Sequence, residues 1–600
     1  MAEPTSSIAV DLSPTNEKTA ISTPQAKMQT APRPGEAAIK QQYLLPYVPF
    51  HNEKKIAETK ALETTTEQSN NADAHSDGPP RKKREKGMNK NRPRNPNPSG
   101  KDKICRKFLE CGTCQFGDNC NFSHDIQSVI DDRPPDIGEK CVNFKVFGKC
   151  PYGVACRFGK EHLTEEFKNI TMETFSVSYL DQIKNTLTKN LQVELRKKRI
   201  PFPRSDEYMK RMKKLQQEGR SLGEMGEYKT SGVITNEDII KSRPCEKKKI
   251  DFSDKLYLAP LTTVGNLPFR RLCKSLGADI TCGEMAMCTN LLQGMQSEWA
   301  LMKRHPSEDI FGVQLCGSFP DTMSKCAELL QSKTEIDFID VNVGCPIDLV
   351  FNKGAGSALM ERSRRFEEIV RGMKYVLDIP LSVKMRTGVH DKKWNALQLV
   401  PKIRNWGASL VTLHGRSREQ RYTKSADWAY INQCAKAASP MPLFGNGDIL
   451  SFEDVERHRQ ETGVSGVMIA RGALIKPWIF TEIKEKRHWD ISSSERLDIV
   501  KEYVNFGMEH WGSDSEGVER TRRFLLEWLS FLYRYIPVGL LERLPQRINE
   551  RPPPFVGRND LETLMASNKC EDWIKISEMF LGPVPLDFAF LPKHKANSYS

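Results

Sequence analysis

Eight short β-rich runs between residues 251 and 490 constrain the fold of this chain more than any other feature of its sequence. They span residues 256–260, 279–283, 310–315, 338–343, 381–385, 409–413, 442–444 and 466–469. The segments between them are polar and long enough to form helices, so strand and helix alternate along the chain. Eight such units predict an α/β fold, a (β/α)8 TIM barrel, which typically has about 250 residues. A doubly wound open sheet is the alternative arrangement.

Polar side chains occur in several of these runs or directly after them, where a packed core does not favour them. Gln314, Asn342, Lys384 and His414 lie in four of the runs or at their ends, and Asn446-Gly447-Asp448 follows a fifth. Burying an unpaired amide costs a few kcal/mol, and an unpaired ammonium costs more. The carboxyl ends of barrel strands form the active site of this fold. We therefore predict that these residues line one ligand site.

Cys345 stands directly after the run at residues 338–343, between Gly344 and Pro346. Proline cannot donate to a strand ladder, so the strand ends before Pro346. We therefore predict that Cys345 lies at the carboxyl end of a strand and faces the ligand site.

The last run continues into Ala470-Arg471-Gly472, where small residues allow backbone N–H groups to approach an anion. In barrels of this type a phosphate often binds after the last two strands. A phosphate site, an amide (Gln314) and a buried cation (Lys384) around one pocket suit flavin mononucleotide (FMN). Lys384 is placed to stabilise negative charge on a reduced flavin ring.

Two clusters of cysteine and histidine lie within residues 101–165. Their members are Cys105, Cys114, Cys120 and His124, then Cys141, Cys150, Cys156 and His162. Three thiolates and one imidazole complete a tetrahedral zinc site and leave no position for a substrate, so we predict two structural zinc ions. In so small a segment, metal binding supplies most of the folding free energy.

The spacing of both clusters resembles that of the CCCH zinc-finger family, although the last gap of the second cluster has five residues where three are usual. This resemblance implies binding to single-stranded RNA. Aromatic residues alternate with Lys and Arg in the same segment, and aromatic faces stack on unpaired bases while cations contact phosphates. The aromatics are Phe108, Phe116, Phe122, Phe144, Phe147, Tyr152 and Phe158, and we expect about half of them to pack the small core instead.

The remaining segments are assigned from composition. Residues 1–100 are polar and poor in aromatics, which predicts a disordered tail, and they contain the basic run Arg81-Lys82-Lys83-Arg84. Residues 166–250 form a basic helical connector, and residues 491–600 form a C-terminal helical domain. The net charge of +13 favours an anionic partner. We expect no secretory signal and no membrane span, a reducing compartment, and residence in the cytoplasm and/or the nucleus.

From about residue 250 to 590 the chain resembles the flavin-dependent tRNA-dihydrouridine synthases. The motifs that carry this resemblance are Ala259-Pro260-Leu261-Thr262, Asp340-Val341-Asn342-Val343-Gly344-Cys345-Pro346, Lys353-Gly354-Ala355-Gly356, Val383-Lys384-Met385-Arg386-Thr387-Gly388, Leu413-His414-Gly415-Arg416, Gly445-Asn446-Gly447-Asp448 and Ala470-Arg471-Gly472. Two CCCH fingers ahead of the barrel resemble the eukaryotic branch of the family that modifies uridine 47 of tRNA.

The resemblance implies a role for each matching residue. Pro260, Leu261 and Thr262 line the flavin, and Gln314 and Lys384 contact its polar ring edge. The flavin's other polar atoms and its phosphate are held by His414, Asn446, Gly447, Asp448, Ala470 and Arg471. NADPH or NADH reduces FMN, hydride passes to C6 of uracil, and Cys345 is the general acid that protonates C5. The implied partner is tRNA, which the resemblance also expects to dock on the C-terminal helical domain at residues 491–600. Messenger RNA remains open as a second substrate.

Three arginines after the His414 run, Arg416, Arg418 and Arg421, are expected to meet phosphates or the base at the barrel mouth. Two other functions stay open. One is a flavin barrel that reduces a free small molecule, against which the fingers argue. The other is an RNA-binding protein with a vestigial barrel, against which an intact Cys345 and Lys384 argue.

Overall fold

The computed structural model describes residues 35–46, 103–173, 175, 182–224, 246–420, 422, 424–586 and 588–593. Eight parallel strands form a closed barrel, because β1 pairs with both β2 and β9 and every other strand pairs with its neighbours. The strands are β1 (Leu256–Leu258), β2 (Ile280–Cys282), β4 (Ile310–Cys316), β5 (Phe338–Val343), β6 (Leu381–Arg386), β7 (Leu410–His414), β8 (Leu443–Asn446) and β9 (Gly466–Ile469). A short β3 (Ala286–Met287) adds to the end of β4. The prediction of a TIM barrel is confirmed, and the open sheet is excluded.

Aromatic side chains fill the amino-terminal half of the barrel. Phe338 lies edge-on to Phe252 and Tyr257, with ring centroids 6.3 and 6.0 Å apart. Phe444 of β8 packs on the same two rings. All four side chains are buried in one apolar cluster. Apolar side chains fill this end of the barrel. The polar residues at the carboxyl ends of the strands are therefore the candidates for a ligand site.

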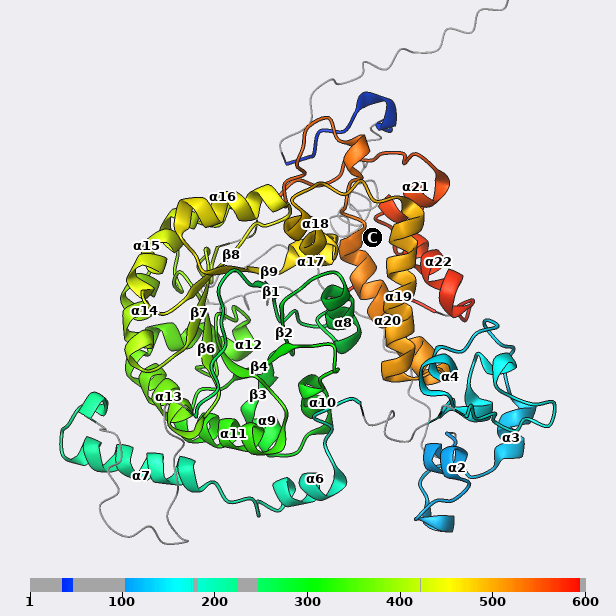
Figure 1. The fold of residues 1–600 in the computed structure, drawn as a ribbon, viewed down its shortest axis with the longest axis horizontal. Helices are drawn as coiled ribbons and strands as arrows, with labels where there is room; N and C mark the ends of the chain where they lie inside the picture. Colours follow the sequence, from blue (N-terminus) through cyan, green and yellow to red (C-terminus); the bar gives the residue numbers. More distant parts are fainter. Residues whose placement is uncertain are drawn as a thin grey trace, which may run out of the picture.

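Helices surround the barrel as an outer ring (Figure 1). They are α8 (Leu267–Ser275), α9 (Cys288–Leu292), α10 (Gln296–Trp299), α11 (Pro320–Lys333), α13 (Ser363–Val376), α14 (Ala396–Asn405), α15 (Trp428–Ala438), α16 (Phe452–Thr462), α17 (Arg471–Ile475) and α18 (Ile479–Glu485). The short α12 (Asp348–Phe351) follows β5 and appears inside this ring (Figure 1). The connector assigned to residues 166–250 contributes α6 (Lys189–Arg196) and α7 (Pro203–Gln217). The buried Tyr208 fixes α7 to α13, because its hydroxyl donates to the carbonyl of Glu368 at 2.8 Å.

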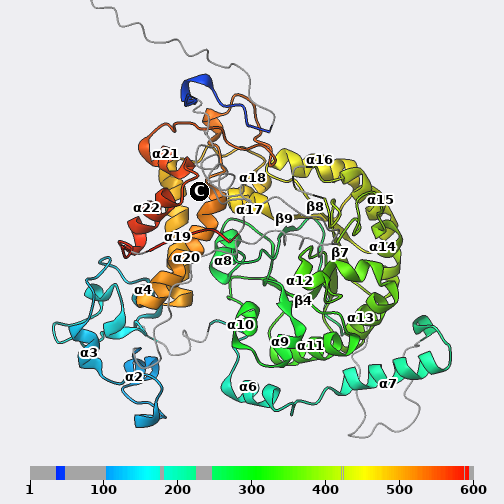
Figure 2. The ribbon, with the colours of Figure 1, turned by 180° about the vertical axis from the view of Figure 1, so that it is seen from behind.

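A helical domain packs on one side of the barrel, as Figures 1 and 2 show from opposite directions. It contains α19 (Ser493–Trp511), α20 (Ser515–Leu532), α21 (Asp560–Ala566) and α22 (Cys570–Leu581). The buried Trp528 of α20 stacks edge-on to Phe269 of α8 at 5.6 Å and donates from its indole N–H to the carbonyl of Leu474 at 3.1 Å. The domain is thus attached to both the first and the last βα unit of the barrel. No helix among the described residues is both long and apolar enough to cross a membrane.

Residues 35–46 are an exception to the disorder expected for residues 1–100. Ala37 and Ile39 are buried at 2% and 6% exposure in a small cluster with Ile536, Leu540 and Phe555. Backbone hydrogen bonds reinforce the contact, including one from the N–H of Ala37 to the carbonyl of Arg551 at 3.0 Å. Composition over a long window concealed this short apolar segment. The basic run at residues 81–84 lies outside the described residues.

Candidate active site and zinc centres

The parallel register brings the polar strand ends side by side. Asn342 of β5 is level with Lys384 of β6, and His414 of β7 is level with Asn446 of β8. All four lie in the carboxyl-terminal half of their strands, as the sequence predicted. This end of the barrel is therefore where the candidate residues meet.

Cys345 lies in a turn that two polar side chains hold. The side-chain oxygen of Asn342, Oδ1, accepts the backbone N–H groups of Gly344 at 3.1 Å and of Cys345 at 2.8 Å. The hydroxyl of Ser357 donates to the backbone carbonyl of Cys345 at 2.8 Å. The backbone of Cys345 is thus fixed between the end of β5 and the 3-10 helix at Gly356–Glu361. The sequence identified Asn342 only as a polar residue at a strand end. The structure shows that its side chain positions the backbone of Cys345.

The Cys345 thiol is suited to donate a proton. It is 8% exposed, and burial raises its pKa above the ordinary value, while the N–H of Ile347 and the charges of Arg386 and Arg418 act in the opposite direction. The sulfur therefore stays protonated at neutral pH. A protonated thiol is a general acid, whereas a nucleophilic cysteine needs a lowered pKa.

The ammonium group of Lys384 makes no hydrogen bond and no ion pair within the part of the chain that the structure describes. Burial, together with the charge of Arg386, lowers its pKa to about 7, although the carboxylate of Asp340 partly offsets this effect. A buried cation without a partner destabilises a protein unless a ligand compensates it. Lys384 is thus placed to meet an anionic or electron-rich group.

Gln314 belongs to a hydrogen-bond network beneath the site. Its amide nitrogen donates to Asp340 at 2.7 Å, and its carbonyl oxygen accepts from Asn342 at 2.7 Å. Ser382 donates to the other oxygen of Asp340 at 2.6 Å. The amide retains one hydrogen and one lone pair for a ligand. Contact between Gln314 and the flavin stays a prediction, and the network gives this residue a second task, which is to orient Asn342.

On the opposite side of the site, two arginines converge on Asp448. Its carboxylate accepts from Arg416 at 2.6 and 2.7 Å and from Arg471 at 2.9 Å. The backbone N–H of Ala426 donates to it at 2.7 Å. The carboxylate therefore orients the arginines, and an anionic ligand would meet Arg471 and backbone N–H groups here and not the side chain of Asp448.

The expectation that Arg416 meets RNA is wrong in this structure, because its side chain is fully buried. Arg418 forms an ion pair with Asp348 and lies over the ring of Phe351 at 3.8 Å. Arg421 lies outside the described residues. A run of three arginines cannot show from sequence alone which of them has a carboxylate partner elsewhere in the fold.

The remaining predicted ligand residues surround the same end of the barrel. Burial and four neighbouring cations lower the pKa of His414 well below its ordinary value, so its imidazole is neutral. Asn446 donates to the carbonyl of Met468 at 2.8 Å, which leaves its oxygen as an acceptor. Gly447 has φ +146°, and a Cβ there would lie 2.5 Å from Ala426. Ala470 precedes α17, and Pro260, Leu261 and Thr262 form the loop between β1 and α8.

Together these residues fit FMN. Lys384 is a cation without a partner among the described residues, His414 is neutral, and Arg471 supplies a further cation on the other side of the site. Lys384, Arg386, Arg416 and Arg471 all lie near His414, so the site carries an excess of positive charge that a phosphate and a reduced ring would neutralise.

Each zinc finger brings its four predicted ligands together. In both fingers the ligand atoms all lie within 4.8 Å of one another. The sulfur atoms of Cys114 and Cys120 are 3.8 Å apart, and those of Cys141 and Cys156 are 3.7 Å apart. Tetrahedral zinc with Zn–S bonds of about 2.3 Å requires about 3.8 Å between sulfurs. Both sets therefore fit zinc.

The two histidines complete the zinc sets. Nε2 of His124 and Nε2 of His162 are buried without a hydrogen-bond partner, as a nitrogen reserved for a metal would be. Nδ1 of His162 bonds to Oδ1 of Asn169 at 2.9 Å, and such an outer partner fixes the orientation of a metal-binding imidazole. His162 thus occupies the fourth position in spite of the unusual gap before it.

The second finger is docked on the helical domain. The Ser513 hydroxyl lies 3.1 Å from the sulfur of Cys156 and 3.7 Å from that of Cys150. The N–H of Arg157 donates to the carbonyl of Ser513 at 2.8 Å. Tyr152 is buried against Gly512, where a Cβ would lie 2.5 Å from its hydroxyl. A residue 357 positions away from Cys156 in sequence thus contributes to the surroundings of the second metal centre.

The first finger has aromatic side chains on its surface. Phe116 and Phe122 are 50% and 46% exposed, and the ammonium group of Lys189 lies 4.5 Å above the ring of Phe116. Phe108 instead stacks on His124 at 4.5 Å, where it shields the metal site. Exposed rings beside cations suit unpaired bases and phosphates. The first finger is therefore the better candidate for RNA contact.

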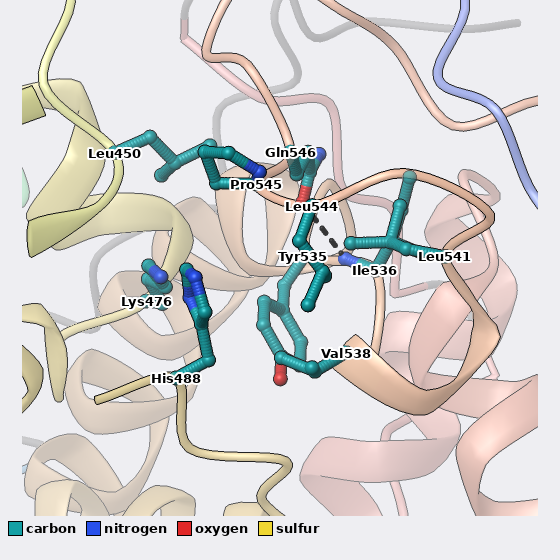
Figure 3. A pocket seen from close by; sticks show the side chains of 10 residues that line it. All are labelled: Leu450, Lys476, His488, Tyr535, Ile536, Val538, Leu541, Leu544, Pro545 and Gln546. Carbon is teal, nitrogen blue, oxygen red and sulfur yellow. Dashed lines mark hydrogen bonds between the residues drawn. The ribbon is translucent and has the colours of Figure 1, made fainter. Parts of the chain in front are cut away.

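A small cavity between barrel and helical domain is not the ligand site (Figure 3). Its volume of about 10 Å³ holds about one water molecule. Two polar groups in its wall already have partners, Lys476 with Glu482 and His488 with Glu453. The N–H of Ile536 donates across it to Gln546 at 3.1 Å.

Comparison with known proteins gives matches over the barrel and both fingers. A family model described as "Dihydrouridine synthase (Dus)" matches residues 257–524. Models described as "CCCH-type zinc finger" and "DUS3L CCCH zinc finger domain" match residues 103–125 and 133–165.

Similar proteins from three vertebrates carry the name tRNA-dihydrouridine(47) synthase NAD(P)(+)-like. The one from Xenopus laevis is 57% identical over 94% of this chain and 96% of its own length. The one from Homo sapiens is 58% identical, and the one from Xenopus tropicalis is 60% identical, each over 86% of this chain and 84% of its own length.

Proposed function

The chain belongs to the dihydrouridine synthase family, and we propose that it reduces a uridine of tRNA to 5,6-dihydrouridine with NADPH or NADH as the reductant. The observation that carries this proposal is the buried Cys345 thiol, whose pKa burial raises, held by Asn342 at the carboxyl end of β5. It shares the site with Lys384, which has no partner among the described residues. Position 47 is proposed from the names of the similar proteins.

The β1–α8 loop, Lys384, His414, Arg471 and the backbone at Gly447 would hold FMN, which would supply a hydride to C6 of uracil. Cys345 transfers its proton to C5, so one hydride and one proton saturate the C5–C6 double bond. The charges of Arg386 and Arg418 stabilise the thiolate that remains, until solvent returns the proton. Asn342 and Ser357 keep the sulfur in place by fixing both sides of its backbone.

The target base must leave its stack to reach a thiol at the end of a barrel strand. We propose that the first finger holds neighbouring unpaired nucleotides on Phe116 and Phe122, with Lys189 at their phosphates. The second finger is docked on the helical domain and acts chiefly to hold that domain and the first finger in register.

The test is anaerobic incubation of the purified protein with NADPH and unmodified tRNA, followed by mass analysis of nucleosides and of mapped fragments. We expect a gain of two hydrogens at one uridine, in the fragment that contains position 47. A flavin that NADPH bleaches without any change in tRNA would favour reduction of a small molecule. Failure to bind FMN, with tRNA binding retained, would favour an RNA-binding protein with a vestigial barrel.

A further inference from the structure

Thr263 has a backbone conformation that its side chain does not favour. Its φ is +76°, in the left-handed region that β-branched residues rarely adopt. It directly follows Pro260, Leu261 and Thr262, the loop proposed to line the flavin. Such strain persists only where the surrounding structure holds it, and it is often found at functional sites.

Three side chains from different parts of the chain hold Thr263. The carboxylate of Glu284 accepts its backbone N–H at 2.7 Å, and the amide of Asn266 donates to its backbone carbonyl at 3.1 Å. The ammonium group of Lys593 donates to its hydroxyl at 2.9 Å. Every polar group of Thr263 therefore has a partner. Asn266 and Glu284 lie within 21 residues of Thr263 in the sequence, whereas Lys593 lies 330 residues after it.

Lys593 reaches the barrel from the C-terminal segment, which α20 anchors. The backbone N–H of Lys593 donates to the carboxylate of Glu527 at 3.0 Å, and Glu527 is 1% exposed. A second link from the helical domain lies beside it, because Asn266 also bonds to the hydroxyl of Tyr503 in α19 at 3.4 Å. Burial raises the pKa of the Glu284 carboxyl, and the nearby ammonium group of Lys593 acts in the opposite direction.

We propose that Lys593 is a positioning residue for the cofactor. By holding Thr263 in its left-handed conformation, it sets the shape of the loop at residues 260–262 and couples the helical domain to flavin binding. The proposal rests on the proposed function, since it takes this loop as part of the FMN site. The side chain of Lys593 needs no contact with the flavin for this role.

The test compares Lys593→Met, Lys593→Arg and the control Lys575→Met in the full-length protein stripped of flavin. Lys575 is an exposed lysine of α22 that pairs with Asp572, so it matches the charge change without the contact to Thr263. We expect Lys593→Met to weaken FMN affinity about tenfold, and Lys593→Arg and Lys575→Met to stay within about threefold of the natural chain. Quenching of FMN fluorescence measures the affinity.

A rescue separates positioning from a general loss of structure. Glycine adopts a positive φ without strain, so Thr263→Gly needs no clamp. We expect Lys593→Met combined with Thr263→Gly to bind FMN within about threefold of Thr263→Gly alone. Unchanged affinity in Lys593→Met, or a tenfold loss that persists in the double variant, would overturn the proposal.

Hydrogen exchange in the flavin-free protein gives a readout that does not depend on the cofactor. We expect Lys593→Met to speed exchange in the peptide that covers residues 260–266, with no such change in Lys575→Met. Unchanged exchange would overturn the clamp. A natural chain that binds no FMN would instead refute the proposed function, while the exchange experiment would still decide whether Lys593 holds the loop.

Discussion

Replacing Lys384 with methionine should stabilise the flavin-free protein while it weakens FMN binding. The ammonium group has no hydrogen bond or ion pair among the described residues, and its pKa falls from 10.5 to about 7, chiefly through burial. Methionine has a similar length and no charge to desolvate. A buried lysine that lowers the stability of the flavin-free protein is expected where its ammonium group binds a ligand.

The magnitude follows from the pKa. Each pKa unit corresponds to about 1.4 kcal/mol, so a fall from 10.5 to about 7 sets an upper limit of about 5 kcal/mol below pH 7. Lys384 keeps partial solvent access, so we take about half of this limit. The expected gain in the free energy of unfolding is therefore about 2 kcal/mol at pH 7.

The gain should depend on pH in a defined direction. Between pH 7 and 10.5 the unfolded chain binds the Lys384 proton and the folded chain tends to release it, so the natural protein becomes more stable as the pH rises. Lys384→Met lacks this dependence. The advantage of the variant should consequently shrink from about 2 kcal/mol at pH 7 to about 1 kcal/mol at pH 9.

Urea unfolding of the flavin-free proteins at both pH values, followed by tryptophan fluorescence, measures this difference. Lys402→Met, a change of an exposed lysine on α14, is the control and should alter stability by less than about 0.5 kcal/mol. FMN affinity of Lys384→Met should fall at least about tenfold. A variant less stable than the natural chain at pH 7, or an advantage independent of pH, would refute the reasoning.

Three other changes test separate parts of the account. Asn342→Ala leaves two backbone N–H groups unpaired and should lower the free energy of unfolding by about 2–4 kcal/mol in urea titrations; a loss below about 1 kcal/mol would contradict its role in holding the turn. The raised pKa of Cys345 predicts slow alkylation by iodoacetamide at pH 7 that accelerates as the pH rises, measured by peptide mapping, and rapid modification at pH 7 would show a thiolate instead. Cys105→Ser should weaken tRNA binding about tenfold with little change in melting temperature, because the first finger carries the exposed aromatic rings. Cys141→Ser should instead lower the melting temperature, because the second finger is packed on Ser513. Equal effects of the two variants on both readouts would contradict this division of roles between the fingers.

Local patterns in the sequence carried most of the fold and the metal ligands. The eight strands were predictable because each is a short apolar run with turn residues on both sides, and the order of the runs fixes a parallel barrel. The zinc ligands were predictable from spacing alone, and His162 takes its place although its gap is unusual. These features depend on residues that are close in sequence.

Long-range pairing limited what could be predicted about the site. The sequence placed Arg416 at the barrel mouth, but its partner Asp448 lies 32 residues away, and their ion pair buries it. Composition assigned residues 35–46 to a disordered tail, yet Ala37 and Ile39 are buried against residues near position 540. The contacts of Ser513 with the second finger and of Lys593 with Thr263 leave no local signal in the sequence.

Cys345 is proposed to supply the proton in the reduction of uracil. The most direct test mixes protein whose flavin has been reduced beforehand with unmodified tRNA, without oxygen, and follows dihydrouridine by mass over a single turnover. Cys345→Ala should form product at least about a hundredfold more slowly than the natural chain while its flavin is still reduced by NADPH, because a general acid contributes at least that factor. Cys434→Ala, a change of a buried cysteine on α15, should react at the natural rate. Equal rates in Cys345→Ala and the natural chain would contradict the account.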